Sequence, residues 1–497
     1  KSTPNDIWGS SLTFVNSAAF SGGNENGTFR TSFTNYYHEG SLDNSLMKRN
    51  TIDFNGDYNF TEKLRVFAGV TYTDSKGLGR VATGYESRNP MQSFRQWWNV
   101  SVDMQKQKDA YILTGQNMTW NLKDWESQEV GYADNYYFNR YQNYQTDQRN
   151  RYTGNVGLNY KFTDWLSAMG RFTFDNYNEL REERIAVGSS GGQGRTDHGG
   201  LGEYYFMDHT VSETNYDLIF NVNKDITENI NLYGNAGWNL RVNQRNGVSA
   251  MTNGGLKIPG LYTIANSMNP LTVNEIGQFD INKKVDGLFA QISLGFWNTL
   301  FLEGSARWDR SSALPEDNNR YFYPSGSASL IFSEFFNSKD IVNFGKVRFN
   351  YAKVGNDTDP YQVYNIFNLV ADFNGSGAAT APPASNNPKL KPEMMEEYEA
   401  GLEMAFFRNR VSFDVSLYKR TTFDLITNTT ISSSSGYQSL WVNAGDIENK
   451  GIEARLTVTP IRTNDFRWDV TANFAKNDNK VLRIFGDNEY LQLASAW

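Results

Sequence analysis

The chain has 497 residues, a formal net charge of −8, 28 Tyr, 33 Phe and 12 Trp, but no Cys and only 3 His. The absence of Cys excludes disulfides, thiolate metal sites and a Cys nucleophile, and the mild negative charge argues against a nucleic-acid binder. No run of about 18 apolar residues occurs, which excludes a transmembrane helix. A membrane β-barrel stays open, because each of its strands carries only half of an apolar pattern.

Strict alternation of apolar and polar residues recurs along the chain. In residues 230–241, apolar side chains occupy one face, while Asn and Arg side chains occupy the other. The same pattern recurs in 300–308, 411–417 and 466–474. Such runs reach the length of about ten residues that a strand needs to cross a bilayer at a tilt. A polar inner face and an apolar outer face are typical of a membrane barrel.

The alternating stretches group into about eight hairpins, and hence about sixteen strands. The stretch 396–406 also matches a helical pattern, but the regular hairpins favour a strand there. The predicted pairs are 11–20 with 29–38, 49–59 with 64–73, 149–161 with 166–176, 211–223 with 230–241, 285–296 with 300–309, 321–332 with 344–353, 396–406 with 410–420, and 449–459 with 465–476.

Connections are short within hairpins and mostly long between them, as in 74–148, 177–210, 242–284 and 354–395. Short turns on one side and long loops on the other are typical of outer-membrane barrels. We therefore predict an all-β fold, a transmembrane antiparallel β-barrel. The alternative is a soluble β-sandwich or propeller, which strand length and loop asymmetry both disfavour.

The aromatic-rich connection 74–148 is the first candidate for substrate or partner contact. Aromatic faces beside amide side chains suit stacking on, and hydrogen bonding to, sugars or peptides. Alternatively, these rings pack the loop against itself or against a lid partner, or form an interfacial girdle. The candidate residues are Trp97, Trp98, Trp120, Trp125, Tyr136, Tyr137 and Tyr141.

The strands near residue 400 carry charged side chains on one predicted face. They could line the lumen of the barrel and bias the passage of solutes, or they could be solvated wall that is compensated by neighbouring basic residues. The three His residues are too few and too scattered for a metal site or a catalytic base, so we predict no enzyme activity and no cofactor. The candidates for the lumen-facing side are Glu397, Glu399, Glu403, Asp414 and Arg420.

Three segments are similar to one known family. They are 301–336 (FLEGSARWDRSS…), 387–426 (NPKLKPEMMEEYEAG…) and 442–481 (VNAGDIENKGIEARL…). These segments resemble the SusC/RagA class of TonB-dependent transporters from Bacteroidetes outer membranes. The resemblance implies a plugged barrel of about 22 strands in the outer membrane, coupled to TonB and partnered by a SusD-like surface lipoprotein.

Under this resemblance, residues 1–497 are a partial barrel domain, with the plug, the N-terminal extension and the last strands missing. The first and last strands should then not be neighbours, and about six further strands should lie between them. The implied function is TonB-coupled import of a bulky nutrient, either an oligosaccharide or a peptide. The alternatives are a passive porin-like channel of about sixteen strands and a surface adhesion or scaffold barrel.

Overall fold

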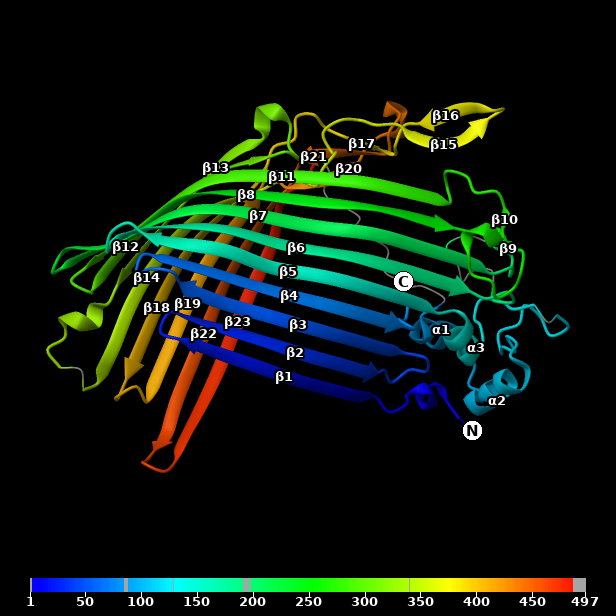
Figure 1. The fold of residues 1–497 in the computed structure, drawn as a ribbon, viewed down its shortest axis with the longest axis horizontal. Helices are drawn as coiled ribbons and strands as arrows, with labels where there is room; N and C mark the ends of the chain where they lie inside the picture. Colours follow the sequence, from blue (N-terminus) through cyan, green and yellow to red (C-terminus); the bar gives the residue numbers. More distant parts are fainter. Residues whose placement is uncertain are drawn as a thin grey trace.

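One antiparallel sheet of 16 strands forms the body of the protein, as Figure 1 shows. The computed structural model describes residues 2–84, 88–127, 129–190, 195, 198–338 and 340–485, without the side chains of Gln96, Trp97 and Ala371. In sheet order the strands are β1 (Leu12–Asn24), β2 (Gly27–Glu39), β3 (Leu46–Asn59), β4 (Leu64–Leu78), β5 (Gln145–Lys161), β6 (Leu166–Ile185), β7 (Glu203–Thr227), β8 (Ile230–Met251), β11 (Ile276–Phe296), β12 (Leu300–Ser311), β13 (Arg320–Leu330), β14 (Val342–Asn356), β18 (Glu393–Phe406), β19 (Val411–Phe423), β22 (Asp446–Arg462) and β23 (Arg467–Arg483).

All eight predicted hairpins are confirmed, and most strands extend further than the sequence indicated. β7, for example, has 25 residues and continues well past the predicted 211–223. The ambiguous stretch 396–406 lies within β18 and is a strand. Its alternation, with Tyr398 and Leu402 on the opposite face from Glu399, prevails over the helical propensity of its residues because both neighbouring strands pair with it.

The sheet has one apolar face and one polar face. A cross-strand row on the apolar face joins Leu218, Trp238, Leu288, Trp308 and Phe322, each directly opposite the next. These large side chains are exposed in the isolated chain, with Leu288 at 58% and Trp308 at 52%. An apolar band across consecutive strands is the surface that a bilayer covers in a membrane barrel.

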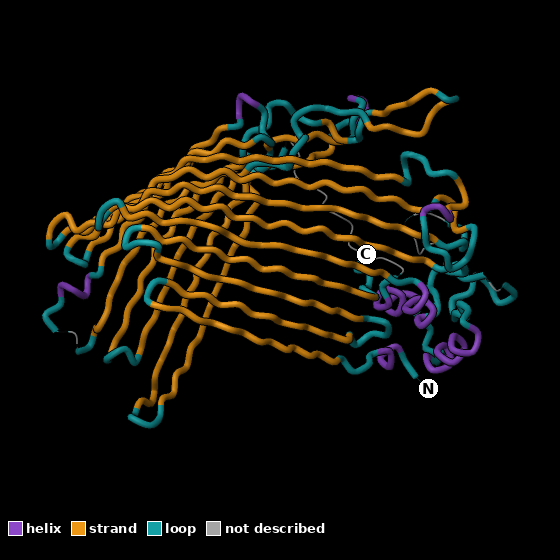
Figure 2. Tube along the Cα trace, in the orientation of Figure 1, coloured by secondary structure: helices purple, strands orange, loops and turns teal. Residues whose placement is uncertain are grey.

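The two ends of the sheet differ in their connections. At one end short turns join the hairpins, including 297–299 and 407–410, where non-glycine residues such as Trp297 and Asn409 adopt positive φ. The longer connections gather at the other end, where most of the helices drawn in Figure 2 lie. These connections carry η1 (Pro4–Ile7), α1 (Pro90–Trp97), α2 (Met104–Thr114), α3 (Tyr136–Gln142), β9 (Asn253–Leu256), η2 (Ile264–Asn266), β10 (Ser267–Asn269), η3 (Glu316–Asn318), β15 (Asn368–Phe373), β16 (Ser376–Thr380), β17 (Ala384–Ser385), β20 (Ile426–Thr430), η5 (Ser433–Ser435) and β21 (Ser439–Asn443), whereas η4 (Phe332–Phe335) lies at the short-turn end.

The connection predicted as the loop 74–148 is shorter and more ordered than expected. β4 continues to Leu78 and β5 begins at Gln145, so the connection is 79–144, and it contains three helices. Asn89, Asp103 and Asn135 each begin one of these helices by accepting a hydrogen bond from a backbone N–H of the first turn. Among the described residues, no helix is long and apolar enough to cross a membrane.

The first and last strands of the sheet are not neighbours. β1 and β23 stand at opposite ends of the strand order, and the described residues show no pairing between them. Each described side chain of β23 is exposed. The prediction that the first and last strands do not pair is therefore confirmed.

Candidate functional site

The connection 79–144, which we call the helical cap, is held together by an apolar cluster. Ile7, Met104, Tyr136 and Tyr137 are its buried members, and Phe94, Trp98 and Tyr111 pack against them. The rings of Trp98 and Trp120 meet edge to face, with their centroids 5.5 Å apart. The cap is therefore a folded unit with a small core of its own, and η1 at the start of the chain contributes to that core.

Two buried polar side chains tie the cap together and to the sheet. The Asn135 amide donates to the backbone oxygens of Gln107 (2.8 Å) and Met118 (2.9 Å). The Arg140 guanidinium donates to the backbone oxygens of Asp43 (2.9 Å) and Gly79 (2.8 Å). Because Asp43 belongs to the β2–β3 connection and Gly79 directly follows β4, Arg140 fixes the cap onto the end of the sheet.

A third buried group, Asp134, joins the cap to the connection after β6. Its Oδ1 accepts from the Asn117 amide (2.7 Å) and from the backbone N–H of Ser190 (2.8 Å), and its Oδ2 accepts from the Asn143 amide (3.2 Å). Burial raises the pKa of Asp134 to about 6, although the backbone N–H of Ser190 and the Asn117 amide act in the opposite direction.

The seven aromatic residues predicted for substrate contact have different surroundings. Tyr136 and Tyr137 are buried in the cap core, where their rings pack the loop against itself, which is the alternative that the sequence left open. Trp98 and Trp120 pack together, also within the cap. Trp125 is 89% exposed, and Tyr141 is partly exposed while it stacks on Tyr111. The side chain of Trp97 lies outside the described residues.

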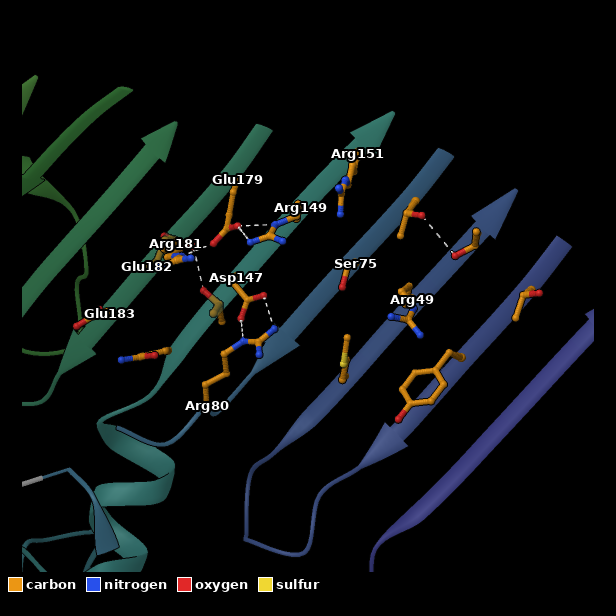
Figure 3. Close-up of a pocket in the computed structure, with 17 residues that line it drawn as sticks. Arg49, Ser75, Arg80, Asp147, Arg149, Arg151, Glu179, Arg181, Glu182 and Glu183 are labelled. Carbon is orange, nitrogen blue, oxygen red and sulfur yellow. Dashed lines mark hydrogen bonds and ion pairs between the residues drawn. The ribbon is translucent and has the colours of Figure 1, made fainter. Parts of the chain in front are cut away.

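Beside the cap, the polar face of β2–β6 forms a cavity of about 690 Å³, which Figure 3 shows in close-up. We call it the arginine pocket, because guanidinium groups from β3, β5, β6 and the segment after β4 converge on it. Hydroxyl groups of Thr and Ser cover its floor between the charged side chains. Its arginines are Arg49, Arg80, Arg149, Arg151 and Arg181, and its acids are Asp147, Glu179, Glu182 and Glu183.

Ion pairs hold most of these charges in place. Arg80 forms a two-pronged pair with Asp147, and Arg149 and Arg181 both bind the single carboxylate of Glu179. Arg151 pairs with Asp175, its Nε donating over 2.8 Å. Pairing to fixed carboxylates restricts the rotamers of long side chains, so the pocket presents its guanidinium groups in defined positions.

The acidic residues predicted near residue 400 share the polar face of β18 and β19. Arg348 of β14 donates to Glu399 (3.3 Å) and to Asp414 (2.8 Å), and Arg420 pairs with Glu397. Glu403 lies directly opposite Asp414 in the register. The structure thus brings all five residues onto one face of the sheet, where neighbouring arginines compensate at least three of the acids.

Sequence reasoning missed the arginine pocket and the polar anchors of the cap. Arg149 and Arg151 alternate with Asn150 and Tyr152, so period two could have assigned them to the polar face. Nothing in the sequence relates them to Arg49 or Arg80, because only the strand register brings those residues together.

Comparison with known proteins gives the relatives of this chain. A family model described as "TonB dependent receptor-like, beta-barrel" matches residues 114–493. TonB-dependent receptor P3 of Formosa agariphila is 26% identical over 498 residues, which cover 96% of this chain and 46% of that protein. TonB-dependent receptor SusC of Bacteroides thetaiotaomicron is 27% identical over 214 residues, covering 41% of this chain and 21% of SusC.

A solved structure has the same fold. "Structure of the RagAB peptide transporter" superposes with a TM-score of 0.81 at 16% identity, over 97% of this chain and 53% of that one. Nearly all of this chain therefore aligns with receptor P3 and with this transporter, but it spans only about half of their length. The predicted fold class, the outer-membrane location and the resemblance to SusC and RagA are confirmed. The chain belongs to the family of TonB-dependent receptor β-barrels.

Proposed function

We propose that the protein to which this chain belongs imports a bulky nutrient, an oligosaccharide or a peptide, across the outer membrane. Import is driven through TonB, and a SusD-like surface lipoprotein is the partner. The family and its member SusC support active import, and the similarity to the RagAB peptide transporter supports the peptide class. The oligosaccharide class follows from the resemblance to the SusC/RagA class of transporters. The residues 1–497 supply part of the barrel, which about six further strands and a plug complete.

The arginine pocket is the observation that carries this proposal. It lies on the polar face, which we assign to the lumen because the opposite face carries the apolar band. It also lies at the end of the sheet where the long connections gather, which is the extracellular end of an outer-membrane barrel. A solute entering from outside would meet these guanidinium and hydroxyl groups first, and Glu397, Glu399, Glu403, Asp414 and Arg420 face the same lumen.

The exposed part of the cap is the proposed contact for substrate or lipoprotein. Trp125 stands at the tip of a loop whose two ends are already joined, since the backbone N–H of Gly131 donates to the backbone oxygen of Asn121 over 2.7 Å. An exposed indole ring held on a closed loop suits stacking on a sugar or packing against a protein partner.

The two alternatives make different demands on the fold. A passive channel of about sixteen strands requires a hydrogen-bonded ladder between β1 and β23, whereas the described register places them at opposite ends of the sheet. A scaffold barrel binds partners without transport. The described strands therefore argue against the closed channel. An uptake measurement distinguishes the scaffold from a transporter.

The test is uptake by cells that carry the full-length protein. We expect labelled peptides or labelled oligosaccharides to enter these cells, and uptake to be lost both when the gene is deleted and when TonB is inactivated. Uptake that persists without TonB would support the passive channel. Surface binding without uptake in TonB-competent cells would support the scaffold.

A loop variant tests the role of the cap within the same assay. Residues 122–130 are replaced by a two-residue glycine turn between Asn121 and Gly131, which leaves the cap core intact. We expect weaker uptake or weaker lipoprotein binding, with normal heat-modifiable migration of the folded barrel as the control for assembly. Unchanged uptake together with unchanged lipoprotein binding would refute the assignment of the cap as a contact surface.

A further inference from the structure

The arginine pocket contains a gap between two guanidinium-bearing strands. The strand register aligns Tyr36, Arg49, Ser75, Arg149 and Glu179 in one row across β2 to β6, each directly opposite the next. Neighbouring strands lie about 4.8 Å apart, so Arg49 and Arg149 leave the sheet roughly 10 Å apart. Ser75 lies between them with a side chain of only one carbon and a hydroxyl, as Figure 3 shows.

The charge around this gap is not balanced. Arg149 shares the Glu179 carboxylate with Arg181, so two guanidinium groups bind one acid. Arg49 stacks over the Tyr36 ring, 5.1 Å from its centroid. Within the described part of the chain, neither the Arg49 guanidinium nor the Ser75 hydroxyl has a hydrogen-bond or ion-pair partner, and Figure 3 draws no dashed line to either. Each other arginine of the pocket is paired with an acid.

We propose that the gap over Ser75 binds a carboxylate group of the transported substrate, between the guanidinium groups of Arg49 and Arg149. This inference rests on the proposed import function and specifies its substrate as an acid, either a peptide carboxylate or a uronate of an oligosaccharide.

The chemistry of the gap fits a carboxylate in three respects. A guanidinium group donates two parallel N–H bonds to a planar carboxylate, and the Ser75 hydroxyl can donate a third bond from the floor. The Tyr36 ring orients the planar Arg49 guanidinium without using its hydrogen-bond donors. Neighbouring Thr51 and Thr73, whose hydroxyls lie 3.5 Å apart, extend the floor along the strands toward the short-turn end.

A built-in carboxylate provides a test that needs no ligand. Ser75→Asp places an acid between the two guanidinium groups, whereas Ser75→Asn has the same shape and no charge. We expect Ser75→Asp to unfold at a higher temperature than Ser75→Asn in the purified full-length protein. An equal or lower unfolding temperature for Ser75→Asp would overturn the proposal, because the gap would then not favour a negative charge.

Binding measurements on the full-length protein in detergent test the ligand itself. The probes are N-acetyl tetra-alanine with a free or an amidated C-terminus, and tetragalacturonate with free or methyl-esterified carboxylates. We expect only the acid form of one pair to bind tightly, and we expect Arg49→Gln and Ser75→Asp each to weaken that binding by about 10- to 100-fold. Which pair responds identifies the source of the carboxylate.

Arg65→Gln is the matched control. Arg65 of β4 lies on the same polar face as Ser75 but near the short-turn end, where it pairs with Asp57 of β3. It should leave binding unchanged. Equal binding of the acid and neutral forms, or an equal loss in Arg65→Gln and Arg49→Gln, would overturn the carboxylate site and leave the import function standing. Failure of the wild-type protein to bind either acid probe would overturn this inference, whereas the uptake measurement decides the import function separately.

Discussion

Ile292 and Ser293 are adjacent in β11, yet their side chains lie on opposite faces of the sheet. Ile292 is exposed on the apolar face, directly opposite Gly234 and Gly304. Ser293 lies on the polar face between Tyr233 and Glu303. Because successive side chains of a strand point to opposite faces, two adjacent residues lie in different environments. A single substitution can therefore test either face.

Arginine at these two positions should therefore have very different costs. Ile292→Arg places a charge in the middle of the apolar band, which costs about 2–4 kcal/mol near the centre of a bilayer. Ser293→Arg places the same charge beside the Glu303 carboxylate in the wet interior, and its effect should be small. Urea unfolding of the full-length protein in lipid vesicles measures both. Similar losses of stability in the two variants would contradict the assignment of the faces.

At the scale of elements, the helical cap depends on a few buried polar groups. Asp134 links three segments through the Asn117 and Asn143 amides and the backbone N–H of Ser190. Its folded-state pKa of about 6 is higher than the ordinary value of 3.8, because burial disfavours the charged form. The folded cap consequently binds a proton more tightly than the unfolded cap does.

This shift predicts the direction of the pH dependence of the cap. The stabilising contribution of the protonated carboxyl is fully present below about pH 4, is lost as the pH rises to about 6, and amounts to about 3 kcal/mol. Hydrogen exchange of the α3 amides, corrected for intrinsic rates, should therefore become faster between these pH values. Asp134→Asn cannot titrate and should abolish the change. The same pH dependence in this variant would rule out Asp134 as its cause.

The sequence predicted the elements of the sheet better than those of the cap. Period two in stretches such as 411–417 identifies both the strand and its polar face, so Asp414 and Glu399 could be placed together correctly. Helix α2 escaped prediction because it buries only Met104, and its apolar residues form no stripe along one face. Helices α1 and α3 have only 8 and 7 residues, which is too short for a helical period to stand out. The arginine pocket escaped because Arg49 and Arg149 are a hundred residues apart, and only the cross-strand register aligns them.

At the scale of the whole molecule, the open sheet makes a prediction about its neighbours. Strand edges within lipid must be paired, so further strands of the full-length protein should stand between β1 and β23. The chain has no native Cys, which makes engineered pairs easy to interpret. A Cys pair at Phe14 of β1 and Val470 of β23 should not form a disulfide in the full-length protein.

A positive control comes from two strands that do pair. Ala18 and Phe33 lie directly opposite each other in β1 and β2, so Cys residues at these positions should cross-link readily under mild oxidation. A disulfide between β1 and β23 as efficient as this control would show that the sheet closes on itself. That outcome would support the passive channel.

The pairing order of the strands also has an evolutionary consequence. Each strand of the main sheet is hydrogen-bonded only to its neighbours in the strand order. The long connections all lie at one end of the sheet. A connection such as 79–144 can therefore be replaced by another sequence without changing the pairing of any strand. If the proposed import function holds, related proteins can acquire new cargo preferences by exchanging these connections, while the strands that cross the membrane are inherited unchanged.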